Sequence, residues 1–222
     1  MSGKLDETGV LTAIAGVLDP ELDQSIVELG FVRRIRVADD RVRVELRLPT
    51  YWCAPNFSWL MAEDVREALL ADPNVAEVEV VLVDHHSAGE ISAGVNSGRA
   101  FAEVFGEAPD GRLDDLRDLF RRKALLARQE RALRPLAGDP SRLRIGDLPD
   151  TGDVRSYLDA RAELGLDCSP QAPALTDAAG RPVRGARVGE HLRRARLMGV
   201  SIEGNAAFCR GLLATRYGEA SR

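Results

Sequence analysis

Cysteine, lysine and aromatic side chains are scarce in this chain of 222 residues. Its three cysteines, Cys53, Cys168 and Cys209, are far apart in sequence and form no Cys-x-x-Cys pair. Three cysteines that are far apart argue against a disulfide framework. They predict reduced thiols and hence a cytoplasmic protein. Lysine occurs only at positions 4 and 123, so almost every basic residue is arginine, for which codon bias is the simplest explanation.

Long apolar runs and a strong charge imbalance are also absent. No run approaches the roughly 20 apolar residues that span a bilayer, and the N-terminal stretch MSGKLDETGV lacks the apolar segment of a secretory signal. The formal net charge is -5, from 30 basic and 35 acidic residues that are interspersed. The composition therefore gives no reason to expect binding to a membrane or to nucleic acid.

The hydrophobic pattern of the first 84 residues predicts a helix, two strands, a second helix and a third strand. The first helix has an apolar stripe at helical spacing and ends before Pro20. The second strand alternates cleanly, with Val42, Val44 and Leu46 on one face. This order predicts an α+β fold, in which a small sheet of about three strands has helices packed on one face. The expected segments are 10–18, 31–37, 41–49, 58–73 and 74–84.

Past residue 84 the pattern changes. Residues 85–98 are small and polar, which predicts a linker or an exposed loop. Helical spacing without strand alternation then dominates the chain. The expected helices cover residues 112–133, 154–165 and 186–217, the last segment as two helices broken near Gly199.

These changes predict a domain boundary near residue 95. The first domain would comprise residues 1–95, and residues 96–222 would form a mostly α-helical C-terminal region. We expect this region to pack on the first domain, because Leu113, Leu116 and Phe120 need a surface to cover.

Four short motifs run in order through residues 10–84. They are Asp-Pro-Glu at 19–21, Ile-Val-Glu-Leu-Gly at 26–30, a loop from Thr50 to Cys53, and a valine-rich strand that closes the segment. In this order and spacing they resemble the metal–sulfur cluster biosynthesis family, which includes the SufT and PaaD proteins. The resemblance covers somewhat under half of the chain. The sequence departs from the family pattern in two places, with Ala54 directly after Cys53 and with His85-His86 after the last strand.

The resemblance implies assistance to the assembly of iron–sulfur clusters or related metal centres, by a carrier or adaptor rather than an enzyme. Iron or an iron–sulfur cluster would be held transiently, and zinc is the other metal that such a site suits. The partners would be iron–sulfur assembly proteins or a client metalloenzyme, for example a multi-subunit iron oxygenase. A homodimer that shares two Cys53 loops is one arrangement that the sequence allows.

The stretch PTYWCAPNF at 49–57 is the main candidate for a functional loop. Cys53 follows a predicted strand and precedes a predicted helix, whose positive end favours the thiolate that binds metals or attacks electrophiles. The alternative is a small buried side chain, which is the usual state of a free cysteine. Tyr51, Trp52, Phe57 and Trp59 surround it, and we expect at least one of them to be exposed on a partner surface.

His85 and His86 follow the third predicted strand. They meet the Cys53 loop at one edge of the sheet if the second and third strands are parallel neighbours. Thiolate and imidazole together suit zinc or iron. Because successive side chains diverge, we expect one histidine as a metal ligand with Cys53 and the other as its support. Two solvent-facing loop histidines are the alternative.

Asp19 and Glu21 are the remaining candidates for a cofactor site with Cys53. They could add carboxylate ligands, whereas the structural alternative is that Asp19 fixes the turn and Glu21 caps it locally. Cys209 lies in the middle of a predicted helix and is expected to be packed. His191 lies on a basic helix and is expected at the surface.

Three functions therefore compete. The leading one is a factor for metal-centre assembly that matures a client through the Cys53 loop. The first alternative is a thiol-dependent enzyme with Cys53 as nucleophile and His85 or His86 as base, although no third orienting residue is evident. The second is an interaction module that uses the aromatic loop and needs no metal.

Overall fold

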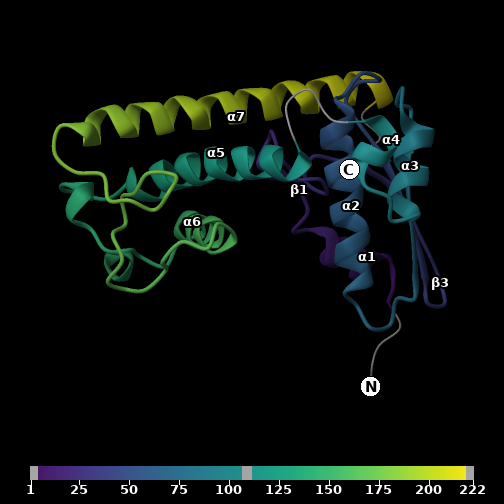
Figure 1. Cartoon of the computed structure of the whole chain (residues 1–222), viewed down its shortest axis with the longest axis horizontal. Coiled ribbons are helices and arrows are strands. Elements are labelled where there is room, and N and C mark those ends of the chain that lie inside the picture. Colours follow the sequence, from purple (N-terminus) through teal and green to yellow (C-terminus); the bar gives the residue numbers. More distant parts are fainter. Residues whose placement is uncertain (1–4, 107–111, 219–222) are drawn as a thin grey trace. The chain divides into compact units, whose positions relative to one another are not determined.

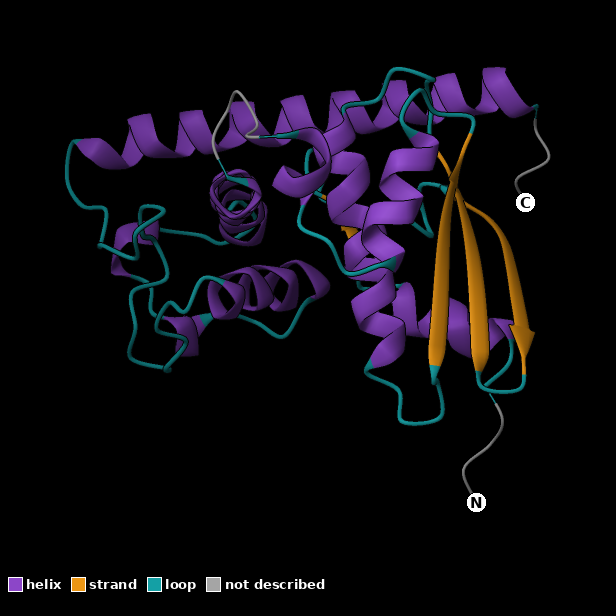
Figure 2. Ribbon diagram, turned by 45° about the vertical axis from the view of Figure 1, so that its right-hand side comes forward, coloured by secondary structure: helices purple, strands orange, loops and turns teal. Residues whose placement is uncertain are grey.

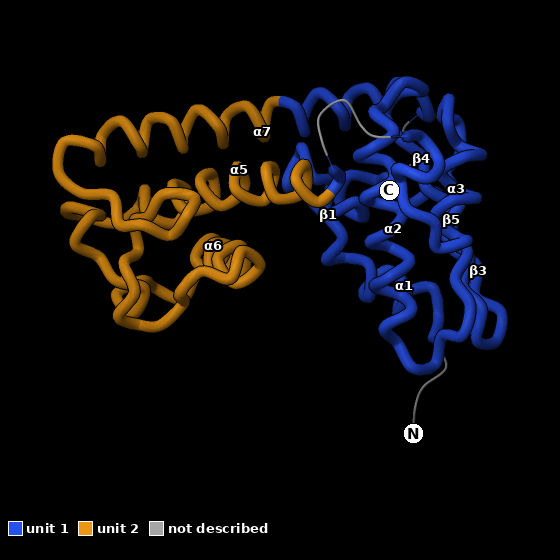
Figure 3. The backbone as a smooth tube through the Cα atoms, viewed as in Figure 1, with its two compact units in different colours: residues 1–113, 205–222 blue, residues 114–204 orange. Residues whose placement is uncertain are grey.

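The computed structural model describes residues 5–106 and 112–218 of the chain (Figure 1). The chain forms two compact units (Figure 3). Unit 1 joins residues 1–113 with residues 205–222, and unit 2 comprises residues 114–204. Among the described residues, no helix is both long and apolar enough to cross a membrane.

Unit 1 is built on a sheet of three strands in the order β3-β4-β5 (Figure 2). β3 and β4 pair antiparallel, and β4 and β5 pair parallel with Val44 opposite Val80. A short antiparallel pair, β1-β2, precedes this sheet. The elements in chain order are α1 (Glu7–Ile14), β1 (Leu18–Asp19), β2 (Gln24–Ser25), β3 (Val32–Ala38), β4 (Arg41–Arg47), α2 (Pro55–Leu70), β5 (Glu77–Val83), α3 (Ala88–Asn96) and α4 (Phe101–Phe105).

Strand alternation gives the sheet one buried and one charged face. Val42, Val44 and Leu46 of β4 are buried, as are the alternate residues of β5. On the other face, Arg43 of β4 forms an ion pair with Glu79 of β5. Because α2 and α3 both pack on β5 and α1 packs on β3, the predicted α+β class is confirmed.

Local sequence determines where α1 and α2 begin. Asp6 is the N-cap of α1, and its side chain accepts a hydrogen bond from the backbone N–H of Gly9 at 2.8 Å. α2 begins with Pro55, whose missing N–H would have no partner within the helix in any case.

The expected linker at residues 85–98 is wrong, because residues 88–96 form the helix α3. Ile91 and Val95, four residues apart, are buried in the core of unit 1. The polar residues of this stretch bind β5: Asn96 exchanges two hydrogen bonds with the backbone of Val80, at 2.8 and 2.9 Å. Ser92 similarly accepts the N–H of Leu82 at 3.0 Å. The small polar residues thus satisfy a free sheet edge, rather than forming a loop.

Unit 2 is helical, with its own hydrophobic core. Its elements are α5 (Leu113–Leu133), two short 3-10 turns (Pro140–Arg142 and Ile145–Asp147), α6 (Gly152–Glu163) and most of α7 (Arg187–Tyr217), whose last turns belong to unit 1. The predicted break near Gly199 is wrong, because α7 is a single helix. A glycine in a helix interior costs only about 1 kcal/mol, which does not end a helix by itself.

The expected boundary at residue 95 lies inside α3. The division into domains of residues 1–95 and 96–222, and the packing of the second on the first, stay predictions.

Candidate functional site

The candidate site lies in two loops at the carboxyl ends of β4 and β5. Because these strands are parallel neighbours, the loop that carries Cys53 and the loop that carries His85 and His86 emerge at the same edge of the sheet. The backbone N–H of His86 donates a hydrogen bond to the carbonyl oxygen of Tyr51 at 3.1 Å, which joins the two loops. The sequence-based expectation that these loops meet is therefore correct.

His85 is buried and holds the backbone of Cys53. Its Nε2 lies 2.7 Å from the carbonyl oxygen of Cys53, and its Nδ1 lies 3.1 Å from the backbone nitrogen of Ser87. A carbonyl oxygen can only accept and a backbone N–H can only donate, so the ring is the neutral tautomer with its proton on Nε2. Burial lowers the pKa of His85, although the bond to Cys53 opposes this. Both ring nitrogens are thus engaged in positioning the loop.

His86 is half-buried and has one nitrogen to spare. Its Nδ1 lies 3.0 Å from the hydroxyl of Ser87. Its ring stacks between those of Trp52 and His85, at centroid distances of 5.4 and 4.4 Å. Within the part of the chain that the structure describes, Nε2 of His86 makes no hydrogen bond. Of the two predicted histidines, His86 is therefore the one that can offer a lone pair.

Cys53 itself is half-buried, with its sulfur 3.3 Å from the hydroxyl of Thr50. All three cysteines of the chain are free thiols. Cys53 lies two residues before the first residue of α2. The thiol is therefore held in place without being sealed in the core.

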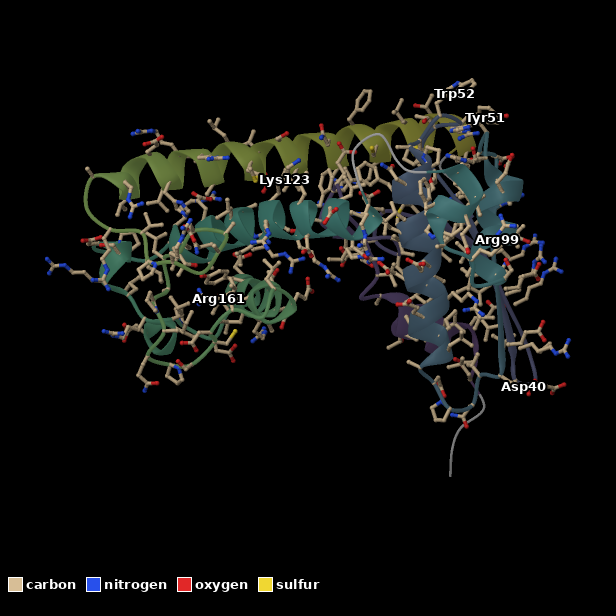
Figure 4. All side chains as sticks on the ribbon, in the orientation of Figure 1. Asp40, Tyr51, Trp52, Arg99, Lys123 and Arg161 are labelled. Atoms are coloured by element: carbon tan, nitrogen blue, oxygen red, sulfur yellow. The ribbon has the colours of Figure 1, made fainter. Side chains whose placement is uncertain are left out.

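The aromatic residues around Cys53 divide as predicted into core and surface. Trp59 is fully buried, whereas Trp52 is 75% exposed and Tyr51 is 46% exposed. Asp40 lies in the turn between β3 and β4, and Figure 4 shows Tyr51 and Trp52 at the opposite end of unit 1 from it. The two rings lie edge to face, 4.9 Å apart between centroids, and form an exposed aromatic pair directly before Cys53 in the chain.

Asp19 is the buried carboxylate of the turn between β1 and β2. Its Oδ1 accepts hydrogen bonds from the backbone N–H groups of Glu21 and Leu22, both at 2.9 Å. The predicted role of Asp19 in fixing this turn is therefore correct. Burial raises the pKa of Asp19 to about 6, although the two hydrogen bonds act in the opposite direction. Glu21 is exposed.

Sequence reasoning did not place a second cysteine, Cys209 of α7, at this site. Residues 205–217 of α7 belong to unit 1, where Arg216 donates hydrogen bonds to the carbonyl oxygens of Leu48 and Asp84, at 3.2 and 2.6 Å. These two residues directly follow β4 and β5, so Arg216 fastens the helix to the edge of the sheet that carries both loops. Arg210 also donates a hydrogen bond to Gln24 at 2.6 Å.

Cys209 directly precedes Arg210 and packs, half-buried, against the core of unit 1. Burial raises the pKa of its thiol to about 11, and the charges of Asp19, Cys53 and Glu21 raise it further in that order. Cys209 is thus packed, as expected, but it also lies within electrostatic reach of all three predicted cofactor-binding residues. Its position in the helix gave no signal of this, because the neighbours are more than 150 residues away in sequence.

The described residues contain no group of three or more histidine, cysteine, aspartate or glutamate side chains that could hold a metal ion between them. The predicted ligands therefore do not form a complete metal site: they are Cys53, Asp19, Glu21 and His86. As ligands they stay predictions, and so does His85, whose ring would first have to give up a hydrogen bond.

The raised pKa of Asp19 predicts a pH-dependent stability. Between pH 3.8 and about 6 the unfolded chain loses the proton of Asp19 while the folded chain keeps it, so stability falls as pH rises through this window. A difference of about 2 pKa units corresponds to about 3 kcal/mol.

Asp19→Asn keeps the acceptor oxygen without the charge. We expect urea unfolding to show the variant gaining up to that amount relative to wild type between pH 4 and pH 7. If the difference in free energy of unfolding between the variant and wild type stays the same from pH 4 to pH 7, the raised pKa of Asp19 is contradicted.

Comparison with known proteins supports an assignment for one segment. Residues 7–80 match the family described as "Iron-sulfur cluster assembly protein". An iron-sulfur cluster carrier protein of Deinococcus radiodurans is 35% identical over 71 residues, which are 32% of this chain and 20% of the relative. One of Synechocystis sp. is 37% identical over 76 residues, 34% of this chain and 21% of the relative. The chain thus spans about a fifth of the length of these relatives.

The resemblance seen in the sequence is thereby confirmed for α1 through most of β5. The matched segment includes Asp19, Glu21 and Cys53, and it ends before His85, His86 and the whole of unit 2.

Proposed function

We propose that this protein carries iron or iron–sulfur clusters and delivers them to a client metalloenzyme through the Cys53 loop. One observation carries the proposal: the half-buried Cys53 lies within a segment that matches an iron–sulfur assembly family, its backbone is held by the buried His85, and the exposed rings of Tyr51 and Trp52 directly precede it in the chain. The cargo would bind Cys53 as a thiolate, with the thiol proton released to water.

An open ligand set suits transfer better than storage. Cys53 would supply one ligand, with His86 or Asp19 as further candidates. The remaining positions on the iron would be filled by the client, or by the Cys53 loop of a second copy. A site that leaves positions open gives the acceptor's own ligands access to the metal.

The alternative of a thiol-dependent enzyme finds less support in the geometry. A general base must reach the proton that it removes. His85 uses Nε2 to donate to the carbonyl oxygen of Cys53 and Nδ1 to accept from Ser87. Neither nitrogen of His85 is therefore free to take the proton of the Cys53 thiol. His86 has a free nitrogen, but among the described residues the hydrogen-bond partner of the Cys53 sulfur is the hydroxyl of Thr50, so we favour the carrier.

The exposed aromatic pair is the proposed contact for the client. Aromatic side chains are enriched at the centres of protein interfaces, and a single buried tryptophan can contribute 2 kcal/mol or more, on the order of a 30-fold change in affinity. We therefore expect Trp52→Ala to slow cluster transfer while leaving cluster binding unchanged.

The experiment measures transfer from the anaerobically reconstituted protein to an apo-ferredoxin, followed by circular dichroism in the visible range. The wild type should speed loading of the acceptor over iron and sulfide alone. Leu70→Ala is the matched control, because Leu70 is an exposed apolar residue at the far end of α2. Equal rates with and without the protein would contradict the proposed function, and equal rates for Trp52→Ala and Leu70→Ala would contradict the role of the aromatic pair.

A further inference from the structure

Unit 2 contains a solvent-open cavity of about 380 Å³ that the proposed function leaves unused. The first two turns of α7 form one side of it, and residues 177–183 form the other. Its charged and titratable lining consists of Asp177, Arg181, Arg187, Glu190, His191 and Arg194.

The cavity has an excess of positive charge. Asp177 and Arg181 form an ion pair at 2.8 Å, and the other carboxylate oxygen of Asp177 accepts two backbone N–H groups. Within the described residues, Arg187 and Arg194 have no ion-pair partner. These two guanidinium groups outweigh the single carboxylate of Glu190. They also lie on the first turns of a long helix, where the backbone dipole favours anions.

A buried hydrogen-bond network fixes the state of His191 at this cavity. Tyr157 donates its hydroxyl proton to the carbonyl oxygen of Ala174 at 2.8 Å. The Tyr157 oxygen is then the acceptor for Nη1 of Arg161 at 2.7 Å and for Nε2 of Gln129 at 2.9 Å. Gln129 thus presents its carbonyl oxygen to Nε2 of His191, 3.0 Å away, and the proton of the ring lies on Nε2.

Three buried polar side chains therefore orient one histidine ring. Gln129, Tyr157 and Arg161 are each at most 1% exposed, and Figure 4 shows Arg161 on α6 in the interior of unit 2. Such a network is costly to bury and stabilises one arrangement when all its members are satisfied. It leaves Nδ1 of His191 as the free nitrogen, with no hydrogen bond in the part of the chain described. Burial also lowers the pKa of His191, so the ring is neutral without a ligand.

We infer that this cavity binds a small oxyanion, a phosphate or a carboxylate group, between Arg187 and Arg194, with Nδ1 of His191 as the third contact. Arginine binds both groups through paired N–H donors. A neutral Nδ1 accepts a hydrogen bond from a protonated phosphate oxygen, and a protonated one donates to a carboxylate. The inference does not depend on the iron–sulfur role, since the family match ends at residue 80.

The test is calorimetric titration of the full-length chain with inorganic phosphate, pyrophosphate and citrate. We expect saturable binding of at least one, and the comparison of citrate with the phosphates tells which oxyanion the site prefers. Arg187→Gln combined with Arg194→Gln should weaken that binding at least about 10-fold, the change that 1.4 kcal/mol produces.

The matched control combines Arg193→Gln with Arg196→Gln, which removes the same charge from the same helix outside the cavity. This control should bind as the wild type does, and thermal melts of both double variants should coincide with that of wild type. Two results would overturn the inference. One is the absence of saturable binding of all three anions, and the other is an equal loss of binding in the control, which would mean attraction by overall charge alone.

Discussion

Cys53→Ser is expected to abolish the retention of iron after anaerobic reconstitution while leaving the thermal melt nearly unchanged. The thiol is half-buried and has the hydroxyl of Thr50 as a partner at 3.3 Å. A serine hydroxyl can keep that partner and is slightly smaller, so we expect neither a large cavity nor an unsatisfied polar group. A neutral hydroxyl is a far poorer ligand for iron than a thiolate. The measurement is iron bound per folded protein, together with the melting temperature.

The other two cysteines serve as controls for this variant. Cys168 is exposed in unit 2, so Cys168→Ser should retain iron as the wild type does. Cys209→Ser should retain most of it, because a thiol with a pKa of about 11 is protonated at neutral pH and binds metal weakly. The contrary result for Cys53→Ser is a clear drop in melting temperature with iron retained per folded molecule. That result would make Cys53 a packing residue.

Gly94→Ala is expected to destabilise unit 1 by 1–3 kcal/mol or more, roughly the cost of overfilling a core. A Cβ atom at Gly94 would overlap one ring carbon of Trp59, and it would lie 2.6 Å from a second ring carbon and 3.1 Å from a methyl group of Val104. Trp59 is fully buried and packs edge-on against Phe101 and Phe105, so a shift of its ring would disturb both contacts.

The matched control is Gly89→Ala in the same helix. Nothing lies within 4 Å of a Cβ atom at Gly89, so the substitution should be neutral or stabilise by up to about 1 kcal/mol through helix propensity. The midpoint of urea unfolding decides between the outcomes. If Gly94→Ala and Gly89→Ala unfold at the same urea concentration as wild type, then α3 does not pack against Trp59 as described.

The fold of residues 10–84 was predictable because β4 and β5 alternate along their length. Val42, Val44 and Leu46 define one face unambiguously, and a parallel neighbour then brings the loop after Val83 beside the loop after Arg47. The helix α3 was missed because its polar residues suggested a loop. Asn96 and Ser92 bind the backbone of β5, and that use of a polar side chain cannot be read from composition.

The candidate site was predictable only in part. Cys53 and Asp19 stood out through local motifs and turn chemistry. The different positions of His85 and His86 could not be predicted, since they depend on which ring meets the carbonyl oxygen of Cys53. Cys209 was beyond reach because Arg216 brings it to the site through contacts with residues more than 100 positions earlier in the chain.

The most direct test of iron–sulfur carriage is the iron and acid-labile sulfide content of the protein purified anaerobically from its native host. We expect both iron and sulfide to copurify with the wild-type protein, and to be lost from Cys53→Ser purified in parallel with a normal melting temperature. A wild-type protein that contains neither iron nor sulfide, or one that contains the same amounts as Cys53→Ser, would contradict the proposed function.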